Sequence, residues 1–293
     1  MAGIKKDMMG KSTQIGLLVA VVSTLVLNGC SSGSLSSMFS SEKKTEEGKP
    51  PNVLFAEADA LLAKGEYTYA AEKFEEVDRQ HPYAQEARRA IVMSAFAYQK
   101  AGKSVEAVAA ARRYITMHPG TKEAALAQNI VATSYFDRIN DPKRDQSETK
   151  KALVELETLS RRYPDSRYAE EAKKRIRIAH DVLAASEMNV GRYYLKQANY
   201  LAAINRFRTV VSDYQTTAHV EEALMRLTES YMALGIVNEA QTAAAVLGHN
   251  FPESRWYKDS YSLLKTGGLS PQEDSGSWIS RTWKKAIGST AQG

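Results

Sequence analysis

Side chains that could carry out acid–base or metal chemistry are scattered in this 293-residue chain. No two of the five histidines have the spacing of metal ligands. Two of them each precede a proline, and these prolines are 37 residues apart (119 − 82 = 37), so a role at a repeated position is favoured over ligation. The five are His81, His118, His180, His219 and His249.

Other signatures of catalysis are missing from the sequence. It contains no Gly-rich phosphate loop, no G-x-S-x-G elbow and no H-E-x-x-H motif. Adjacent carboxylates such as Glu221 and Glu222 point to different parts of a helix surface, which is typical of solvated faces. The cationic run from Lys173 to Arg177 also favours a solvated face over an anionic partner site. We therefore expect no enzymatic activity, no cofactor and no metal.

The lone cysteine is the residue whose position predicts a covalent modification. Residues 1–29 have a basic start and then an apolar run from Ile15 to Leu27. That run is shorter than the roughly 20 residues a spanning helix needs, so it predicts a secretory signal peptide. Cys30 follows the expected cleavage point, and no second cysteine exists for an intramolecular disulfide.

This arrangement resembles the lipobox of bacterial lipoproteins, which implies that Cys30 is acylated and anchors the mature chain to a membrane. A free thiol after an ordinary signal peptide is the alternative. Ser31 follows the cysteine where an inner-membrane retention signal would have Asp, so the resemblance implies the periplasmic face of the outer membrane. Residues 30–51 are rich in Ser, Gly, Lys and Glu and predict a flexible tether after the lipidated cysteine.

The net charge of +5 gives only a weak basic bias. Lys5, Lys6, Lys11 and Asp7 contribute +2 within the predicted signal peptide, which leaves about +3 (5 − 2 = 3). The sequence also lacks a recognition-helix, zinc-finger or RNP pattern. We therefore do not expect nucleic acid as a partner.

The rest of the chain is organised as helix hairpins with a period of 37 residues, which separates Pro82 from Pro119 and Gln215 from Pro252. Large residues in one helix, small residues such as Ala240 in the next and a closing proline are the tetratricopeptide repeat (TPR) pattern. We predict an all-α TPR solenoid in a right-handed superhelix, with five repeats within residues 52–265 and a terminal helix. The repeats span about 52–82, 88–119, 121–164, 166–215 and 221–252.

Two irregularities interrupt the period. The third unit carries a polar insert at about residues 138–146, which predicts a longer turn. Gln215 lies 51 residues after Pro164, 14 more than the period (51 − 37 = 14). Since 14 residues make about four helical turns, one long helix over about 166–197 can absorb them.

Residues 266–293 continue beyond the repeats as a Gly/Ser/Pro linker and a short amphipathic helix over about 278–287. Trp278, Ile279 and Trp283 fall on one half of this helix, and Arg281 and Lys284 on the other. The pattern favours docking of a partner or capping of the last repeat over binding to a membrane surface.

The first helices of TPR units line a concave groove, and with the closing residue counted as position 32, positions 2, 5, 9, 12 and 13 face it. In the first three units these positions mix aromatic, amide and charged side chains, which suits an extended peptide. The alternative is that some of them pack between units. The groove candidates are Phe55, Asp59, Arg89, Val92, Phe96, Gln99, Lys100, Asn129 and Phe136.

The stretch from Tyr193 to Phe207, YYLKQANYLAAINRF, resembles the signature of the BamD family, lipoprotein subunits of the outer-membrane β-barrel assembly machinery. The lipobox, tether and five TPR units resemble the same family. The resemblance implies a scaffold that works beside other Bam lipoproteins. Its carboxy-terminal repeats would hold a POTRA domain of the barrel protein BamA, and its amino-terminal repeats would recognise the signal strand of nascent barrel proteins.

Arg206 matches the family arginine that contacts the POTRA domain, and Asn205 lies beside it. A guanidinium can pair bidentately with a carboxylate at such a contact. The second hypothesis is a different periplasmic TPR adaptor, one that recruits peptidoglycan-remodelling enzymes.

Overall fold

The structure is a computed structural model that describes residues 48–290, with side chains as far as Lys285. The predicted signal peptide, the lipidation site at Cys30 and nearly all of the predicted tether lie outside the described residues. Within the described part, no helix is both long enough and apolar enough to cross a membrane.

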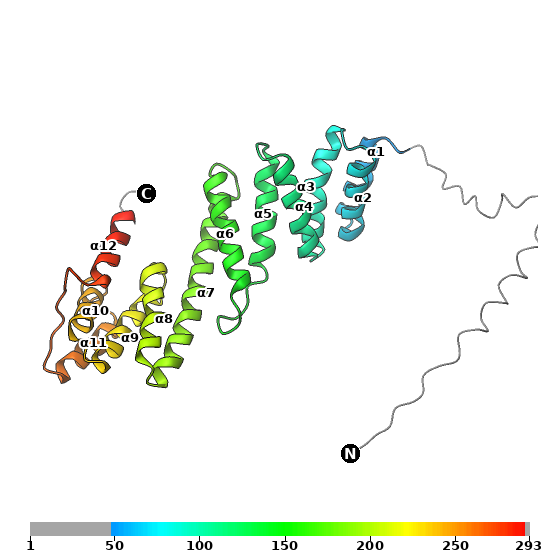
Figure 1. Cartoon of the computed structure of the whole chain (residues 1–293). Coiled ribbons are helices and arrows are strands. Elements are labelled where there is room, and N and C mark those ends of the chain that lie inside the picture. The colour runs from blue at the N-terminus through cyan, green and yellow to red at the C-terminus, as the bar shows by residue number, and fades with distance from the viewer. Residues whose placement is uncertain (1–47, 291–293) are drawn as a thin grey trace, which may run out of the picture. The chain divides into compact units, whose positions relative to one another are not determined.

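Residues 48–290 form twelve helices and no strand, which confirms the all-α prediction. The first ten helices pair as five successive hairpins (Figure 1), and each helix packs on its neighbours along the chain. First helices of adjacent hairpins also touch, as α1 does with α3 and α3 with α5, so the TPR-like hairpins share continuous cores. The hairpins are α1 (Pro51–Ala63) with α2 (Tyr67–Gln80), α3 (Gln85–Lys100) with α4 (Ser104–Met117), α5 (Glu123–Phe136) with α6 (Ser147–Arg162), α7 (Ala169–Lys196) with α8 (Tyr200–Asp213), and α9 (Val220–Ala233) with α10 (Val237–Asn250).

The second helix of each hairpin ends at the residue before the closing position. Its backbone there leaves the helical region, with φ between −130° and −136° and ψ between 38° and 59°. A following proline disfavours the helical region for its predecessor. Tyr214 also leaves that region, although Gln215 and not proline follows it. His81 and His118 are two of these helix-ending residues, which is a structural role.

The two irregularities of the period have clear structural counterparts. The polar insert of the third unit is the segment of residues 137–146 that joins α5 to α6. The extra residues of the fourth unit lie in α7, a single 28-residue helix, as the long-helix prediction requires. Gly191 of α7 lets α8 approach closely, because a Cβ there would lie 2.5 Å from Cε1 of Phe207.

The carboxy-terminal segment caps the last hairpins. After α11 (Arg255–Thr266), the chain returns along α10 to α12 (Trp278–Thr290), which packs on α10 and α8 (Figure 1). Ile279 is fully buried there and Trp283 is 9% exposed. Trp278 donates a hydrogen bond from Nε1 to the hydroxyl of Tyr231 over 2.9 Å. Of the roles left open for this helix, capping is the one its contacts support.

The turn inside a hairpin requires a left-handed backbone. Gly65, Gly102 and Gly235 have φ of +81°, +74° and +70° at this position. A Cβ at any of the three would meet nothing within 4 Å, so backbone conformation and not space favours glycine. In the fourth hairpin Ala198 occupies the equivalent position with φ +54°.

We therefore predict that Ala198→Gly stabilises the protein by about 0.5–1 kcal/mol, because it relieves left-handed strain at a modest cost in unfolded-state entropy. Urea denaturation followed by far-ultraviolet circular dichroism measures the change. Gly102→Ala is the reciprocal control and should destabilise by about 1 kcal/mol. An Ala198→Gly midpoint at or below that of the unchanged protein would contradict the strain argument.

Candidate partner-binding surfaces

Two of the nine predicted groove residues are part of the core. Phe55 on α1 is 7% exposed and packs edge-on against Phe74 at 5.2 Å between ring centroids. Val92 on α3 is 2% exposed in the same core cluster. The expectation that both side chains face a ligand needs correction: they fill the space between helices, because the facing position of a short TPR helix also borders the next hairpin.

A cation lies on the aromatic ring at this end of the predicted groove. The guanidinium of Arg89 on α3 lies 4.9 Å from the ring centroid of Phe55 on α1. Asp59, one turn further along α1, is exposed. Partial desolvation raises the pKa of Asp59, and the charge of Arg89 opposes that shift. Phe55, Asp59 and Arg89 thus form one group across the first and second hairpins.

A second group spans α3 and α5. Lys100 places its ammonium 5.5 Å from the ring centroid of the half-buried Phe96. Gln99 donates a hydrogen bond from its amide to the hydroxyl of Thr133 on α5. That hydroxyl in turn donates to the carbonyl of Asn129 over 2.7 Å. Gln99 is therefore engaged between hairpins, whereas Lys100 remains exposed.

Phe136 belongs to a third group. It is half-buried at the end of α5, it packs against the core cluster of α5, α6 and α7, and the guanidinium of Arg175 on α7 lies 5.2 Å from its ring centroid. The nine residues thus line successive inter-hairpin junctions and do not converge on one cavity. An extended ligand could contact several junctions, but a compact one could not.

Arg206 and Asn205 are exposed on α8. Arg206 is 44% exposed, and its Nη1 lies 3.1 Å from Oε2 of Glu187 on α7. Both residues line a shallow hollow of about 270 Å³ together with Tyr194, Ala202 and Thr209. The structure therefore brings together two parts of the signature stretch, from α7 and from α8.

Sequence reasoning missed an ion pair between α7 and α9. Arg192 donates from Nε and Nη2 to the two carboxylate oxygens of Glu222, over 2.8 and 2.6 Å. The carboxylate is only 12% exposed, and Arg226 lies 3.4 Å away on its other side. Arg192 and Glu222 are positions 9 and 2 of successive units, the positions of Asp59 and Arg89, so extending the groove positions to the last two units would have found them.

The electrostatics of this pair follow from its burial. Desolvation alone would raise the pKa of Glu222. The hydrogen bond and charge of Arg192, followed by the charge of Arg226, outweigh it and hold the pKa below its ordinary value. Hydrogen bonding to Glu222 correspondingly raises the pKa of Arg192.

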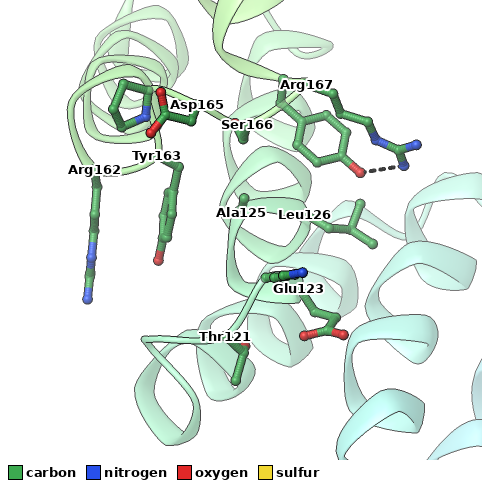
Figure 2. Close-up of a pocket in the computed structure, with 12 residues that line it drawn as sticks. Thr121, Glu123, Ala125, Leu126, Arg162, Tyr163, Asp165, Ser166 and Arg167 are labelled. Atoms are coloured by element: carbon green, nitrogen blue, oxygen red, sulfur yellow. Dashed lines mark hydrogen bonds between the residues drawn. The ribbon is translucent and has the colours of Figure 1, made fainter.

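Sequence reasoning also missed a cavity of about 770 Å³ at the third hairpin (Figure 2). It opens between the first turn of α5 and the segment joining α6 to α7. No local motif predicts it, because its walls come from residues about 40 apart in sequence, such as Leu126 and Tyr163 (163 − 126 = 37). Within the described part of the chain, no group of three or more His, Cys, Asp or Glu side chains is placed to hold a metal ion.

Comparisons with known proteins show the family to which the sequence is related. Residues 47–247 match the YfiO family, described as an outer membrane lipoprotein. The outer membrane protein assembly factor BamD of Caulobacter vibrioides is 42% identical over 225 residues, 77% of this chain and 74% of the relative. That of Rickettsia prowazekii is 39% identical over 249 residues, 85% of this chain and 96% of the relative.

A solved structure of PilW, a type IV pilus biogenesis factor, also matches, with 19% identity over 71% of this chain and 96% of that chain. The TM-score is 0.27, so this likeness carries no argument about function.

The Arg192–Glu222 pair predicts a specific pH dependence. Glu222→Gln should lower the free energy of unfolding at pH 7 by about 1 kcal/mol, because it weakens two charge-assisted hydrogen bonds. A carboxyl whose folded pKa is depressed stabilises the protein above its unfolded pKa, about 4.3, and loses that contribution as pH falls through the folded value. The gap between the two proteins should therefore shrink below about pH 4.3 in urea titrations.

Glu170→Gln is the matched control, since Glu170 is 79% exposed and, within residues 48–290, forms an ion pair only with Lys173 on its own helix. Its effect should be negligible at every pH. A gap between Glu222→Gln and the unchanged protein that stays constant on acidification would show that the carboxylate charge is not what stabilises this junction.

Proposed function

The chain belongs to the YfiO family of outer membrane lipoproteins, which includes the BamD assembly factors, and we propose on this premise that it is a non-enzymatic subunit of the outer-membrane protein assembly complex. The observation that carries the proposal is the family match over residues 47–247, which takes in nearly all of the five hairpins. In this role the protein binds and presents other chains, and it promotes folding and insertion of β-barrel proteins without chemistry of its own.

The contact with a BamA-like barrel protein would be made by the exposed face of α8. Arg206 uses one N–H toward Glu187 and, at 44% exposure, keeps other donors of its guanidinium accessible. Asn205 adds an amide, and Leu201, 64% exposed, adds apolar surface on the same helix. An arginine beside exposed apolar surface is typical of the residues that dominate binding energy in interfaces. A carboxylate on a POTRA domain is the complementary group.

The segment that recognises nascent barrel proteins would be the row of junctions in the first three hairpins. The guanidinium of Arg89 on α3 lies near the ring of Phe55 on α1, and the ammonium of Lys100 lies near the ring of Phe96 within α3, so a cation borders an aromatic ring at two places along these hairpins. An extended strand presents alternate side chains at a regular spacing, so it could meet these junctions in turn. Asp59, Asn129 and the half-buried Phe136 would supply the remaining polar and aromatic contacts.

Anchoring would come from acylation of Cys30, which lies ahead of the described residues. Two or more acyl chains hold a protein stably on a bilayer, whereas a single chain binds only marginally. The tether would then place the repeats at the periplasmic face of the outer membrane, where nascent barrel proteins and the other Bam lipoproteins meet them.

Charge reversal at Arg206 tests the barrel-protein contact. We expect Arg206→Glu to reduce co-purification of a POTRA-containing barrel protein from the native envelope by about tenfold or more, as the loss of a charge-assisted contact would. Mass spectrometry of proteins bound to the full-length chain in mild detergent measures it. Arg177→Glu, the same charge change at an exposed site on α7, should have no effect.

A double variant with swapped charges distinguishes the contact with the partner protein from the ion pair between α7 and α8. Arg206→Glu combined with Glu187→Arg keeps an ion pair between α7 and α8 but still presents a carboxylate at position 206. Binding should stay low in the swap. Restored binding would mean that the internal pair matters, and not a partner carboxylate. Recovery of peptidoglycan-remodelling enzymes in place of a barrel protein, with the unchanged chain, would replace the assembly role by the adaptor role.

Arg89 and Arg88 offer a matched test of the strand-binding junctions. Arg89→Glu should weaken binding of a synthetic peptide that copies the last strand of a barrel protein, because it removes the cation over Phe55. The neighbouring Arg88 is also exposed but lines a different hollow with Tyr83 and His118, so Arg88→Glu should leave affinity unchanged. Fluorescence anisotropy of the labelled peptide measures the affinity. Equal losses of affinity in the two variants would indicate only general charge attraction.

A further inference from the structure

The 770 Å³ cavity at the third hairpin, here named the loop-side cavity, has the construction of a binding site. Its floor is the first turn of α5, with Ala125 and Leu126. Figure 2 shows Arg162 and Tyr163 on one side of this floor and Arg167 on the other. A concave site of this volume with an apolar floor and a few polar groups is typical of sites that enclose a side chain or small ligand.

The aromatic walls each carry a guanidinium. Arg162 lies 5.7 Å from the ring centroid of Tyr163, and Arg167 lies 4.9 Å from that of Tyr168. Arg167 also donates a hydrogen bond from Nη2 to the hydroxyl of Tyr168 over 2.7 Å. The hydrogen bond restrains the guanidinium of Arg167 while most of its donors stay open, which lowers the entropy lost when a ligand binds.

The cations of this rim are not neutralised by a carboxylate of the described residues, unlike several other arginines of the molecule. Arg112, Arg138 and Arg192 each have a carboxylate oxygen within 4.0 Å. No such pair forms at Lys122, Arg162 or Arg167 within residues 48–290. Two carboxylates, Glu123 and Asp165, also line the cavity, so its net charge is +1 (3 − 2 = 1).

The mixture of charges selects between two classes of occupant. A lipid with an anionic headgroup would match the cations, but a phosphate has no N–H donor that could pair with Glu123 and Asp165 at the same rim. A polypeptide offers both complements at once, since its acidic side chains can pair with the guanidinium groups and its backbone N–H groups can donate to the carboxylates. The charge pattern therefore favours a peptide.

The corresponding hollow of the second hairpin lacks this arrangement of guanidinium groups and tyrosine rings. The hollow there has a volume of about 470 Å³, and His118 stands where the loop-side cavity has Tyr163. Arg88 and Asp78 are its charged side chains and cancel each other. The paired guanidinium groups over tyrosine rings are thus a property of the third hairpin and not of the TPR scaffold.

We propose that the loop-side cavity binds an extended segment of a partner protein in which a bulky apolar side chain is flanked by acidic residues. The apolar side chain enters between Tyr163 and Tyr168 onto Leu126, and the acidic residues pair with Arg162 and Arg167. The site lies on the first turn of α5 and the α6–α7 segment, and none of the nine groove candidates lines it, so it goes beyond the proposed contact at Arg206.

Three acetylated, amidated peptides test the proposal on the full-length protein: Gly-Glu-Phe-Glu-Gly, its Lys-Phe-Lys counterpart and its Glu-Ala-Glu counterpart. Fluorescence anisotropy should show the first binding about tenfold or more tightly than either of the others, since each control lacks one of the two kinds of contact. Equal affinities for the first two peptides, or no binding of the first, would overturn the proposal.

Matched variants locate the binding. Arg162→Glu and Arg167→Glu should each weaken the first peptide by about tenfold. Arg161→Glu makes the same charge change on the preceding, exposed residue, which does not line the cavity, and should leave the affinity unchanged. An equal loss in Arg161→Glu would overturn the proposal, because it would mean that overall charge and not the cavity attracts the peptide.

Two further measurements distinguish a peptide site from a lipid site and from the contact at Arg206. If the protein binds vesicles of phosphatidylglycerol and phosphatidylcholine through Arg162 and does not bind the peptides, the occupant is a lipid and the proposal is wrong. Peptide binding at the cavity should be unaffected by Arg206→Glu, and barrel-protein co-purification should be unaffected by Arg162→Glu. The two proposals can therefore fail independently.

Discussion

Close approach of the two helices in each hairpin is the constraint on which the structure depends. It is met by small side chains at the crossing: Ala70, Ala107, Ala203 and Ala240 are all fully buried at the same position of four units. Where the facing side chain is large, the opposite position holds an even smaller residue: Gly191 lies against Phe207. Larger side chains would force the helices apart, and overpacking of this kind costs roughly 1–3 kcal/mol per site. The junctions that present Arg89, Lys100 and Arg206 are fixed by this spacing.

Much of the fold could be predicted because the signals are local and repeat. The closing prolines follow from backbone sterics, which act within a few residues. The small residues of the second helices recur at one position of the repeat because each hairpin has the same helix crossing. The 14 extra residues before Gln215 predicted a long helix because helical phase limits how a solenoid can absorb an insertion, and α7 is that helix. Ala198 shows the limit of such reasoning, since the turn geometry is kept without the residue that favours it.

The surfaces were less predictable because burial depends on the neighbouring hairpin. The position within a repeat predicts which way the side chains of Phe55 and Val92 point, but not how deeply they are buried. Adjacent helices cover both side chains. The Arg192–Glu222 pair and the loop-side cavity each join side chains that are 30 or more residues apart (222 − 192 = 30). Opposite charges nevertheless recur at positions 9 and 2 of successive units, with the signs reversed: Asp59 lies near Arg89, and Arg192 pairs with Glu222. These charges link the first helices of successive hairpins electrostatically.

The capping of the last hairpins by α12 has an optical consequence. All three tryptophans of the chain, Trp256, Trp278 and Trp283, belong to the core cluster at the carboxy-terminal end. Solenoids unfold from local units whose stabilities need not be equal. Tryptophan emission therefore reports on the end that holds α8, α10 and α12, whereas tyrosines lie in both clusters, as Tyr98 and Tyr231 do. Unfolding of the carboxy-terminal end can thus be followed separately, by the tryptophan signal alone.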